Sequence, residues 1–296
     1  MSCAGAWCVV QVQVTDAKTG ETLLNFDFAK GTATLADRGY CHRRGLAHLI
    51  DQGAQPIVRL NPHHVPLGDR AGAVLDLAAA LQDCAPGDTR TLAAQFTAPN
   101  EKTYPVYVHA YRLQGAAAEA ARRRCRRGAQ KAGKKRKYTP SQQSLFLAEF
   151  VLVLTTIEPS VLSAETVLAL YRCRWQIELV FKHFKSLLEM DAVRARHGSV
   201  LGQVWLQGKL LYAALLMRRA ERYCGTQWQR LDQARDGTWW RVWKLVKQEL
   251  APLISLAACW HPADWPKALK ALKERRRKRQ LQRVPQAVAV WLEQPA

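Results

Sequence analysis

The chain has 296 residues, with 44 Lys and Arg against 24 Asp and Glu, and therefore a formal net charge of +20. Hydrophobic residues make up 48% of the chain, enough to bury a core, which excludes a disordered basic tail. The excess positive charge favours a polyanionic partner, with nucleic acid ahead of an anionic membrane surface. The longest apolar stretch, residues 145–157, contains Glu149 and is shorter than the ~20 residues of a membrane-spanning helix, so we expect no membrane anchor. The N-terminus lacks the pattern of a signal peptide, and we expect a cytoplasmic protein.

The cysteines and histidines give little sign of a metal site. Eight cysteines are scattered without a C-x-x-C pair, and we interpret them as free thiols. The adjacent His63 and His64 lie in a segment with proline on both sides, which favours a solvated loop over a metal site.

Residues 1–60 have the pattern of a mixed sheet. We expect strands at 8–14, 21–28, 33–36 and 56–60, and a helix at 43–54 closed by Gly53. The first two strands would form a hairpin around the DAKTG turn. The order of these elements places Asp37 at the carboxyl end of a strand.

The composition changes between residues 61 and 144. Strands are expected at 91–98 and 104–113, followed by an Ala-rich helix from Ala116 that becomes strongly basic. Ten of the sixteen residues of the basic run 122–137 are Lys or Arg. We interpret 61–144 as a mainly β insertion with a basic arm. The basic run would either neutralise DNA phosphates or form a solvated tail. The candidate DNA-binding residues in it are Arg122, Arg123, Lys134 and Lys135.

The second half of the chain is predicted to be mostly helical. Residues 145–157 form a continuous apolar strand, as in a sheet covered on both faces. Ser163 is the expected N-cap of a long helix over 164–193, and a second helix, 200–223, is apolar on most sides and so expected to be buried. Residues 226–296 are expected to be helical, with a second basic run at 270–279.

Four polar residues of the long helix share one face. At about 100° per residue, Tyr171, Arg174, Glu178 and Lys185 fall within roughly 60° of arc. A carboxylate between cations suits a site for a divalent metal and a phosphate. On spacing alone, an ordinary Arg174–Glu178 pair on an amphipathic helix is the favoured explanation of the pattern.

Two motifs resemble one family. The pattern Tyr171, Arg174, Glu178, Lys185 resembles the Y-R-E-K signature of bacterial insertion-sequence transposases, the DDE group called insertion sequence family four. The segment LADRGY, followed by an Arg-rich helix and the strand PIVRLN, resembles the region of the second catalytic aspartate in the same family, which implicates Asp37.

The resemblance implies an α/β, ribonuclease H-like mixed sheet with flanking helices, a mainly β insertion and a helical C-terminal region. It implies catalytic acids that hold two Mg²⁺ or Mn²⁺ ions, with Asp37 and Glu178 as ligands, and double-stranded DNA of transposon ends as the partner, bound by a homodimer. Tyr171 and Arg174 would contact phosphates, and Lys185 would grip DNA. The expected division is 1–60 and 145–225 for the core, 61–144 for the insertion, and 226–296 for the basic C-terminal region.

The family's first aspartate has no clear counterpart here. The family carries it on a strand well upstream of the second, and only 36 residues precede Asp37. The acidic candidates are Asp16, Glu21 and Asp27, none in a suitable strand. We therefore expect an N-terminally truncated transposase core that does not cleave DNA by itself. The alternatives are a DNA-binding remnant that inhibits full-length transposase and, less consistent with both motifs, an unrelated RNA-binding protein.

Overall fold

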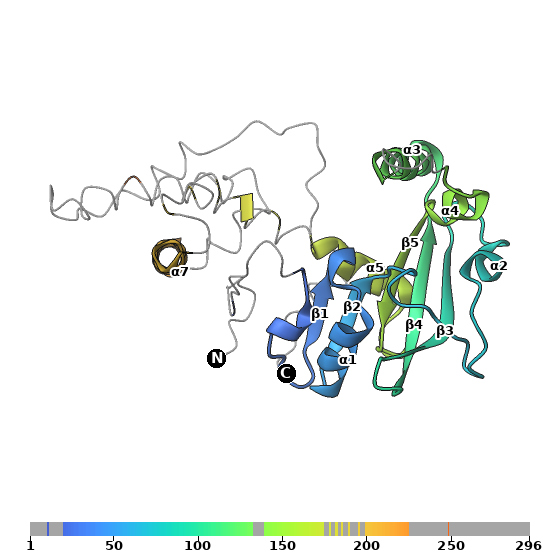
Figure 1. Cartoon of the computed structure of the whole chain (residues 1–296), viewed down its shortest axis with the longest axis horizontal. Coiled ribbons are helices and arrows are strands. Elements are labelled where there is room, and N and C mark those ends of the chain that lie inside the picture. The colour runs from blue at the N-terminus through green and yellow to red at the C-terminus, as the bar shows by residue number, and fades with distance from the viewer. Residues whose placement is uncertain are drawn as a thin grey trace, which may run out of the picture. The chain divides into compact units, whose positions relative to one another are not determined.

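The structure, a computed structural model shown in Figure 1, describes most of the first three quarters of the chain. The described residues are 20–132, 139–174 and 199–224, together with the single positions 11, 178, 181, 182, 185, 189, 195 and 248. The chain divides into two units, one made of 19–174 with 296 and the other of 1–18 with 175–295. Each unit is described by itself.

The first unit is built on one mixed sheet of five strands in the order β1-β2-β5-β4-β3. The strands are β1 (Ala33–Ala36), β2 (Gln55–Arg59), β3 (Thr89–Thr97), β4 (Thr103–Arg112) and β5 (Phe150–Thr155). β1 and β2 are parallel, with Leu35 opposite Ile57, and the other neighbours are antiparallel. The predicted mixed α/β architecture with flanking helices is confirmed.

The β1–α1–β2 segment forms as the sequence predicts. Helix α1 (Arg43–Asp51) buries Leu46 and Leu49 completely, and its spacing of apolar residues explains why this face turns to the sheet. Gly53 has φ +80°, a conformation that glycine adopts without strain, and it reverses the chain into β2. Asp37 follows β1 directly, as expected.

The strand predicted over 21–28 was wrong. This segment contains a 3-10 turn, η1 (Leu23–Asn25), and then irregular backbone up to β1. The Thr22 hydroxyl oxygen accepts a hydrogen bond from the Leu24 N–H (3.2 Å), a local cap that competes with strand pairing. The predicted partner strand, 8–14, lies outside the described residues except for Gln11.

The β3–β4 hairpin confirms the two strands predicted in the middle of the chain. Its turn includes Glu101 at φ 64°. The hairpin joins the common sheet through β4 and β5, and β2 and β5 are direct neighbours. The short helix α2 (Leu77–Leu81) and the long helix α3 (Gly115–Ala132) accompany it. The domain boundaries predicted from the sequence stay predictions.

The apolar strand expected over 145–157 is shorter than predicted. Its first residues belong to helix α4 (Gln142–Leu147), which is capped by the Ser141 hydroxyl accepting from the Ser144 N–H (3.1 Å). The strand β5 begins only at Phe150. An uninterrupted apolar run does not by itself distinguish a helical turn from a strand, which explains the error.

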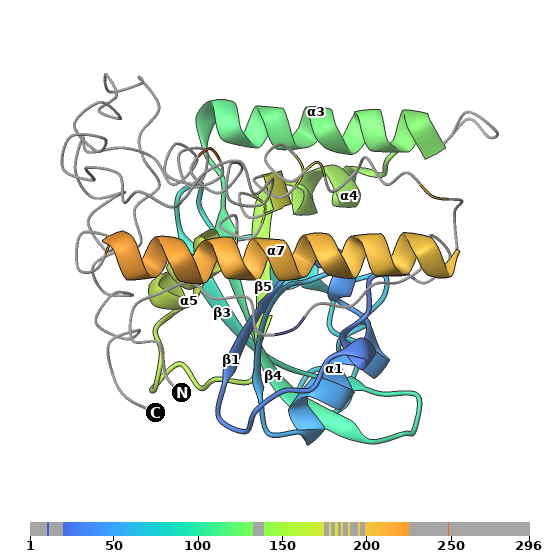
Figure 2. The same cartoon turned by 90° about the vertical axis from the view of Figure 1, so that its left-hand side faces the viewer.

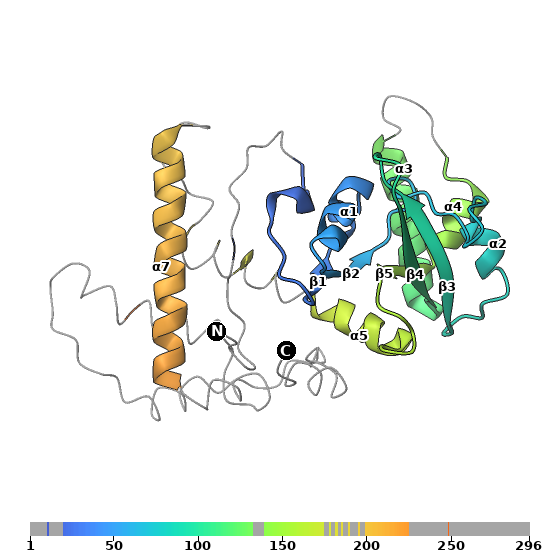
Figure 3. The same cartoon turned by 90° about the horizontal axis from the view of Figure 1, so that it is seen from below.

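Helices cover both faces of the sheet. One face carries the main core, which includes Leu46 and Leu49 of α1 together with Val58, Val108 and Leu154 of the sheet. Successive strand residues point to opposite faces, so Ile57, Val153 and His109, all fully buried, lie on the other face. Helix α5 (Ala164–Cys173) packs against the strands β2 to β5, and Figure 3 shows α1 and α5 on opposite sides of the sheet.

Helix α5 begins as predicted but ends early. The Ser163 hydroxyl accepts from the Thr166 N–H (3.3 Å), which confirms the N-cap. The helix ends at Cys173 with Arg174 as its C-cap, so a single helix over 164–193 was wrong. The apolar spacing continues through this break and does not mark it.

In the second unit, the helix predicted over 200–223 is present as α7 (Val200–Cys224). The expectation that it is buried was wrong for the side chains that the structure describes, because several large apolar ones are exposed. These are Val200, Leu201, Val204, Trp205, Leu211 and Leu215. Apolar composition shows which surface gains from burial, but not which segment covers it. Among the described residues, no helix is long and apolar enough to cross a membrane.

Candidate active site at the end of strand β1

Asp37 lies at the carboxyl end of β1 and begins the next turn. Its Oδ1 accepts a hydrogen bond from the Arg38 N–H (2.7 Å), which caps the 3-10 turn η2 (Arg38–Tyr40). The side chain is 49% exposed, so a ligand can reach the carboxylate. An aspartate that caps its own turn is held in one orientation.

Two residues of the second motif contact this carboxylate. The Tyr171 hydroxyl donates to Asp37 Oδ1 (3.5 Å), and Arg174 Nη1 donates to Oδ2 (3.3 Å). These contacts join residues 134 and 137 positions apart in the sequence. Arg174 reaches Asp37 from the C-cap of α5, and its guanidinium lies 5.8 Å from the centre of the Tyr171 ring. The two motifs identified separately in the sequence therefore meet in space.

A further arginine belongs to this group. Ala36 of β1 is opposite Val58 of β2, so Asp37 and Arg59 come at the same level of the two parallel strands. Burial raises the pKa of Tyr171 above its usual value, and the charge of Asp37 raises it further, while Arg174 and Arg59 oppose this shift. The phenol therefore stays protonated and can act as a hydrogen-bond donor at neutral pH.

Polar residues continue along the same edge of the sheet. Asn61 follows β2; its Oδ1 accepts from Arg38 Nη2 (3.4 Å), and its Nδ2 lies 3.2 Å from His64 Nδ1. The His64 ring stacks on His42, with ring centres 4.5 Å apart. Because the carboxyl ends of parallel strands meet at one edge, this row of polar groups extends the surface around Asp37.

Of the two upstream acidic candidates that the structure describes, Glu21 lies beside this turn. A Cβ placed on Gly39 would be 1.7 Å from Glu21 Oε2, so the Glu21 carboxylate lies directly against the backbone of this turn. Burial raises the pKa of Tyr40, and the charges of Glu21 and Asp37 add to the effect. Asp27 is exposed and lies in irregular backbone, and Asp16 is outside the described residues.

The other predicted site residues make no contact with Asp37 among the contacts that the structure describes. Glu178 and Lys185 are exposed, have helical backbone and belong to the second unit, so their convergence with Asp37 stays a prediction. Arg122 and Arg123 lie on α3, where Arg122 is ion-paired and Arg123 is exposed. Lys134 and Lys135 lie outside the described residues, as does the basic run 270–279.

The donor chemistry at Asp37 suits a hard divalent cation only in part. A half-exposed carboxylate is a good oxygen ligand for Mg²⁺ or Mn²⁺. Within the described residues, however, no group of three or more His, Cys, Asp or Glu could hold a metal ion. Asp37 therefore needs at least one further carboxylate to complete a site.

Known proteins that are similar to this chain point to one family. Residues 7–212 match the family model described as a transposase DDE domain. The chain is 30% identical over 211 residues to the putative transposase InsL for insertion sequence element IS186A of Escherichia coli K12, and equally to the transposase for insertion sequence element IS421 of Escherichia coli. Each alignment covers 69% of this chain and 55% of the relative.

The chain therefore belongs to the family of insertion-sequence DDE transposases, as the two motifs predicted. It spans about half the length of the curated relatives that it matches. Domains of this family depend in general on divalent metal ions.

Sequence reasoning missed Arg59, Asn61 and the stacked His42 and His64. Arg59 and Asn61 stand in the quoted segment PIVRLN, but their place beside Asp37 follows only from the parallel pairing of β1 and β2. The two histidines, 22 positions apart, share no sequence pattern that pairs them.

Proposed function

We propose that this chain carries the catalytic core of a DNA transposase, a ribonuclease H-like domain in which Asp37 and Glu178 share a divalent metal ion. The observation that carries the proposal is the contact of Tyr171 and Arg174 with Asp37, because it joins the two family motifs at one strand end. The family match over 7–212 supports the same function. Double-stranded DNA is the proposed partner, and a homodimer in the DNA complex stays a prediction.

The residues around Asp37 have distinct proposed roles. Asp37 and Glu178 would hold Mg²⁺ or Mn²⁺, which would supply activation of water or of a DNA 3′-hydroxyl and charge stabilisation for the in-line displacement at phosphorus. Asp37 offers its carboxylate oxygens, and Arg174 must yield Oδ2 for a cation to bind there. Arg174 and Arg59 then neutralise phosphate oxygens, and the protonated Tyr171 hydroxyl donates to one. Lys185 binds the DNA of the transposon end at a point distant from the reacting bond.

The position of the family's first aspartate is the least supported part of this site. Between residue 20 and β1 the structure contains no strand, and Glu21 and Asp27 are both exposed. Two-metal catalysis requires all of its carboxylates in place. We therefore propose that the 296-residue chain binds duplex DNA but does not cleave it on its own. A DNA-binding protein that inhibits a longer transposase is the second candidate, favoured because the described residues between 20 and β1 place no carboxylate on a strand.

A nicking assay tests this function. The purified chain with Mn²⁺ should leave supercoiled plasmid uncut, and a fusion that adds a strand bearing an aspartate ahead of Met1 should nick it. Asp37→Asn or Glu178→Gln should abolish nicking by the fusion, whereas Asp83→Asn, at an exposed carboxylate, should not. Nicking that withstands Asp37→Asn would refute the site. Cleavage by the unmodified chain, lost on Glu21→Gln, would show that Glu21 already supplies the third carboxylate.

A further inference from the structure

The basic helix α3 has one face committed to packing. Ala118, Ala121 and Ala129 are buried on this face, and Cys125 between them is half-buried. The Cys125 thiol donates to the Ser144 carbonyl oxygen of α4 (3.9 Å). Figure 2 shows α3 lying along α4. At about 100° per residue, these four positions fall within roughly 80° of arc, a narrow stripe of small residues.

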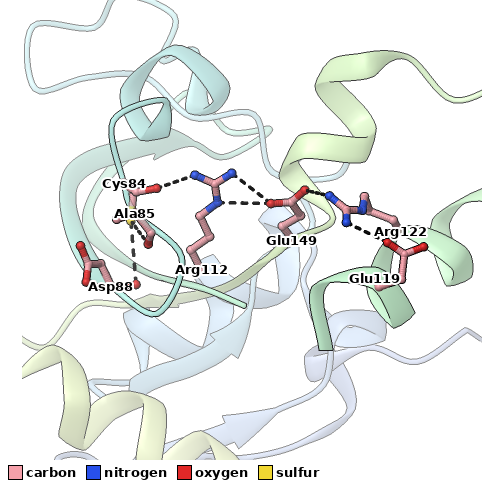
Figure 4. Close-up of polar contacts among 7 residues, drawn as sticks. All are labelled: Cys84, Ala85, Asp88, Arg112, Glu119, Arg122 and Glu149. Atoms are coloured by element: carbon pink, nitrogen blue, oxygen red, sulfur yellow. Dashed lines mark hydrogen bonds and ion pairs between the residues drawn. The ribbon is translucent and has the colours of Figure 1, made fainter. Parts of the chain in front are cut away.

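A buried carboxylate fixes this helix to the sheet, as Figure 4 shows. Glu149, immediately before β5, is 8% exposed. Its Oε2 accepts from Arg112 Nε (3.2 Å) and Nη2 (3.1 Å), and its Oε1 accepts from Arg122 Nη1 (2.7 Å). Arg112 also donates to the Cys84 carbonyl oxygen (2.7 Å). A buried carboxylate held by two guanidinium groups is a strong orienting contact, because both of its oxygens are satisfied.

The charge of Arg122 is compensated within the protein. Its Nη2 donates to Glu119 Oε2 (2.8 Å), one turn away on α3, in addition to its bond to Glu149. The hydrogen bond from Arg122 lowers the pKa of Glu119, which keeps that carboxylate charged. Glu119 is the one acidic residue of α3, and within the described part of the chain no ion pair joins a carboxylate to the other arginines of this helix.

The outward face of α3 consists of exposed arginines that form no ion pair with any described residue. Arg123, Arg124, Arg126 and Arg127 are all exposed, and at about 100° per residue they span roughly 160° of arc opposite the alanine stripe. Arg123 is three and four residues from Arg126 and Arg127, spacings at which like charges on a helix repel. A polyanion bound to this face would remove the repulsion.

We propose that the outward face of α3 binds the phosphate backbone of duplex DNA through Arg123, Arg124, Arg126 and Arg127, while Arg122 anchors the helix through Glu149 and does not contact DNA. The proposal rests on the proposed function, which makes DNA the partner, and it names the surface and divides the basic run by role. This surface lies in the first unit together with Asp37.

The chemistry of the face favours duplex DNA over other anionic partners. Guanidinium groups bind phosphate oxygens in bidentate geometry, and phosphate contacts need no apolar anchor. A membrane-surface helix must bury an apolar face in lipid, but α3 uses its apolar stripe within the protein. A protein interface usually depends on buried aromatic or aliphatic anchors, and the outward positions between 119 and 130 hold none.

The salt dependence of DNA binding by the full chain tests the surface. The slope of log K against log salt is negative, and each lost phosphate contact reduces its magnitude by about 0.9. The double variant Arg123→Gln/Arg127→Gln should therefore reduce the magnitude by about 1.8. At 0.1 M salt this change weakens binding about 60-fold. Lys30→Gln/Arg44→Gln removes the same charge from exposed positions outside α3 and should keep the parent slope. The inference fails if the α3 variant has the slope of this control.

Arg122→Gln tests the division of roles. It should lower the melting temperature and keep the parent slope, whereas a slope lower by about 0.9 at an unchanged melting temperature would overturn the anchoring role. The outcome also separates this inference from the proposed function. If the parent chain does not bind duplex DNA, the proposed function itself fails. If it binds with a slope insensitive to all α3 substitutions, only the assignment of this surface fails.

Discussion

Replacing Glu149 with Gln should destabilise the first unit strongly. The side chain of Glu149 is 10% exposed, and those of its partners Arg112 and Arg122 are 19% and 36% exposed. Removing one member of a buried ion pair costs about 3–5 kcal/mol, since the partner charges stay desolvated and unpaired. Because Arg122 is partly hydrated and retains Glu119, we expect a loss near the lower limit, about 3 kcal/mol.

Urea denaturation measures this loss. With a denaturant dependence of about 2 kcal/mol per molar urea, the unfolding midpoint should fall by about 1.5 M. Residues 20–174 contain no tryptophan, so unfolding of this unit has to be followed by far-ultraviolet circular dichroism. The exposed Glu158→Gln is a matched control and should change stability by less than about 0.5 kcal/mol. A midpoint for Glu149→Gln equal to that of the control would refute the anchoring cluster.

Two further predictions concern buried titratable groups. Burial lowers the pKa of His109, and its Nε2 has no hydrogen-bond partner among the residues that the structure describes. As pH falls through ~6.5, the unfolded chain therefore binds this proton before the folded chain does, and stability decreases. His109→Gln should reduce the fall in denaturation midpoint between pH 7 and 5, and a pH dependence that this variant leaves unchanged would contradict the reasoning. Burial raises the pKa of the Cys41 thiol to about 11, so in mass-spectrometric mapping of iodoacetamide labelling at pH 8, Cys41 should react far more slowly than the half-buried Cys125; equal rates would contradict its burial.

The sequence predicts local elements well where each is bounded by clear stop signals. Asp37 after an apolar strand and Gly53 after an amphipathic helix defined the β1–α1–β2 segment to within three residues at each boundary. The strand predicted over 21–28 was wrong because the Thr22 hydroxyl caps a local turn there, and this one hydrogen bond outweighed the extended apolar pattern. The single helix predicted over 164–193 was wrong for a different reason. The apolar repeat continues past the helix end at Cys173, so the sequence pattern does not mark that end.

The site depends on contacts that no linear pattern contains. Tyr171 and Arg174 were placed with Glu178 by helical spacing and with Asp37 only by family resemblance, whereas the structure joins them to Asp37 directly. Arg59 became part of the site through strand register. Arg122 and Arg123 are neighbours in one basic run, but their side chains leave the helix about 100° apart. Arg122 therefore forms an ion pair with the buried Glu149, whereas Arg123 is exposed.

Binding of Mn²⁺ by the full chain tests the central claim, that Asp37 and Glu178 share one divalent ion. Electron paramagnetic resonance counts the free ion, and the reference variant is Asp83→Asn, which should bind as the parent does. Asp37→Asn and Glu178→Gln should each weaken Mn²⁺ binding at least about tenfold, and the double variant should lose little more, because both ligands serve the same ion. Parent-like affinity in Glu178→Gln, together with a loss in Asp37→Asn, would contradict the shared site.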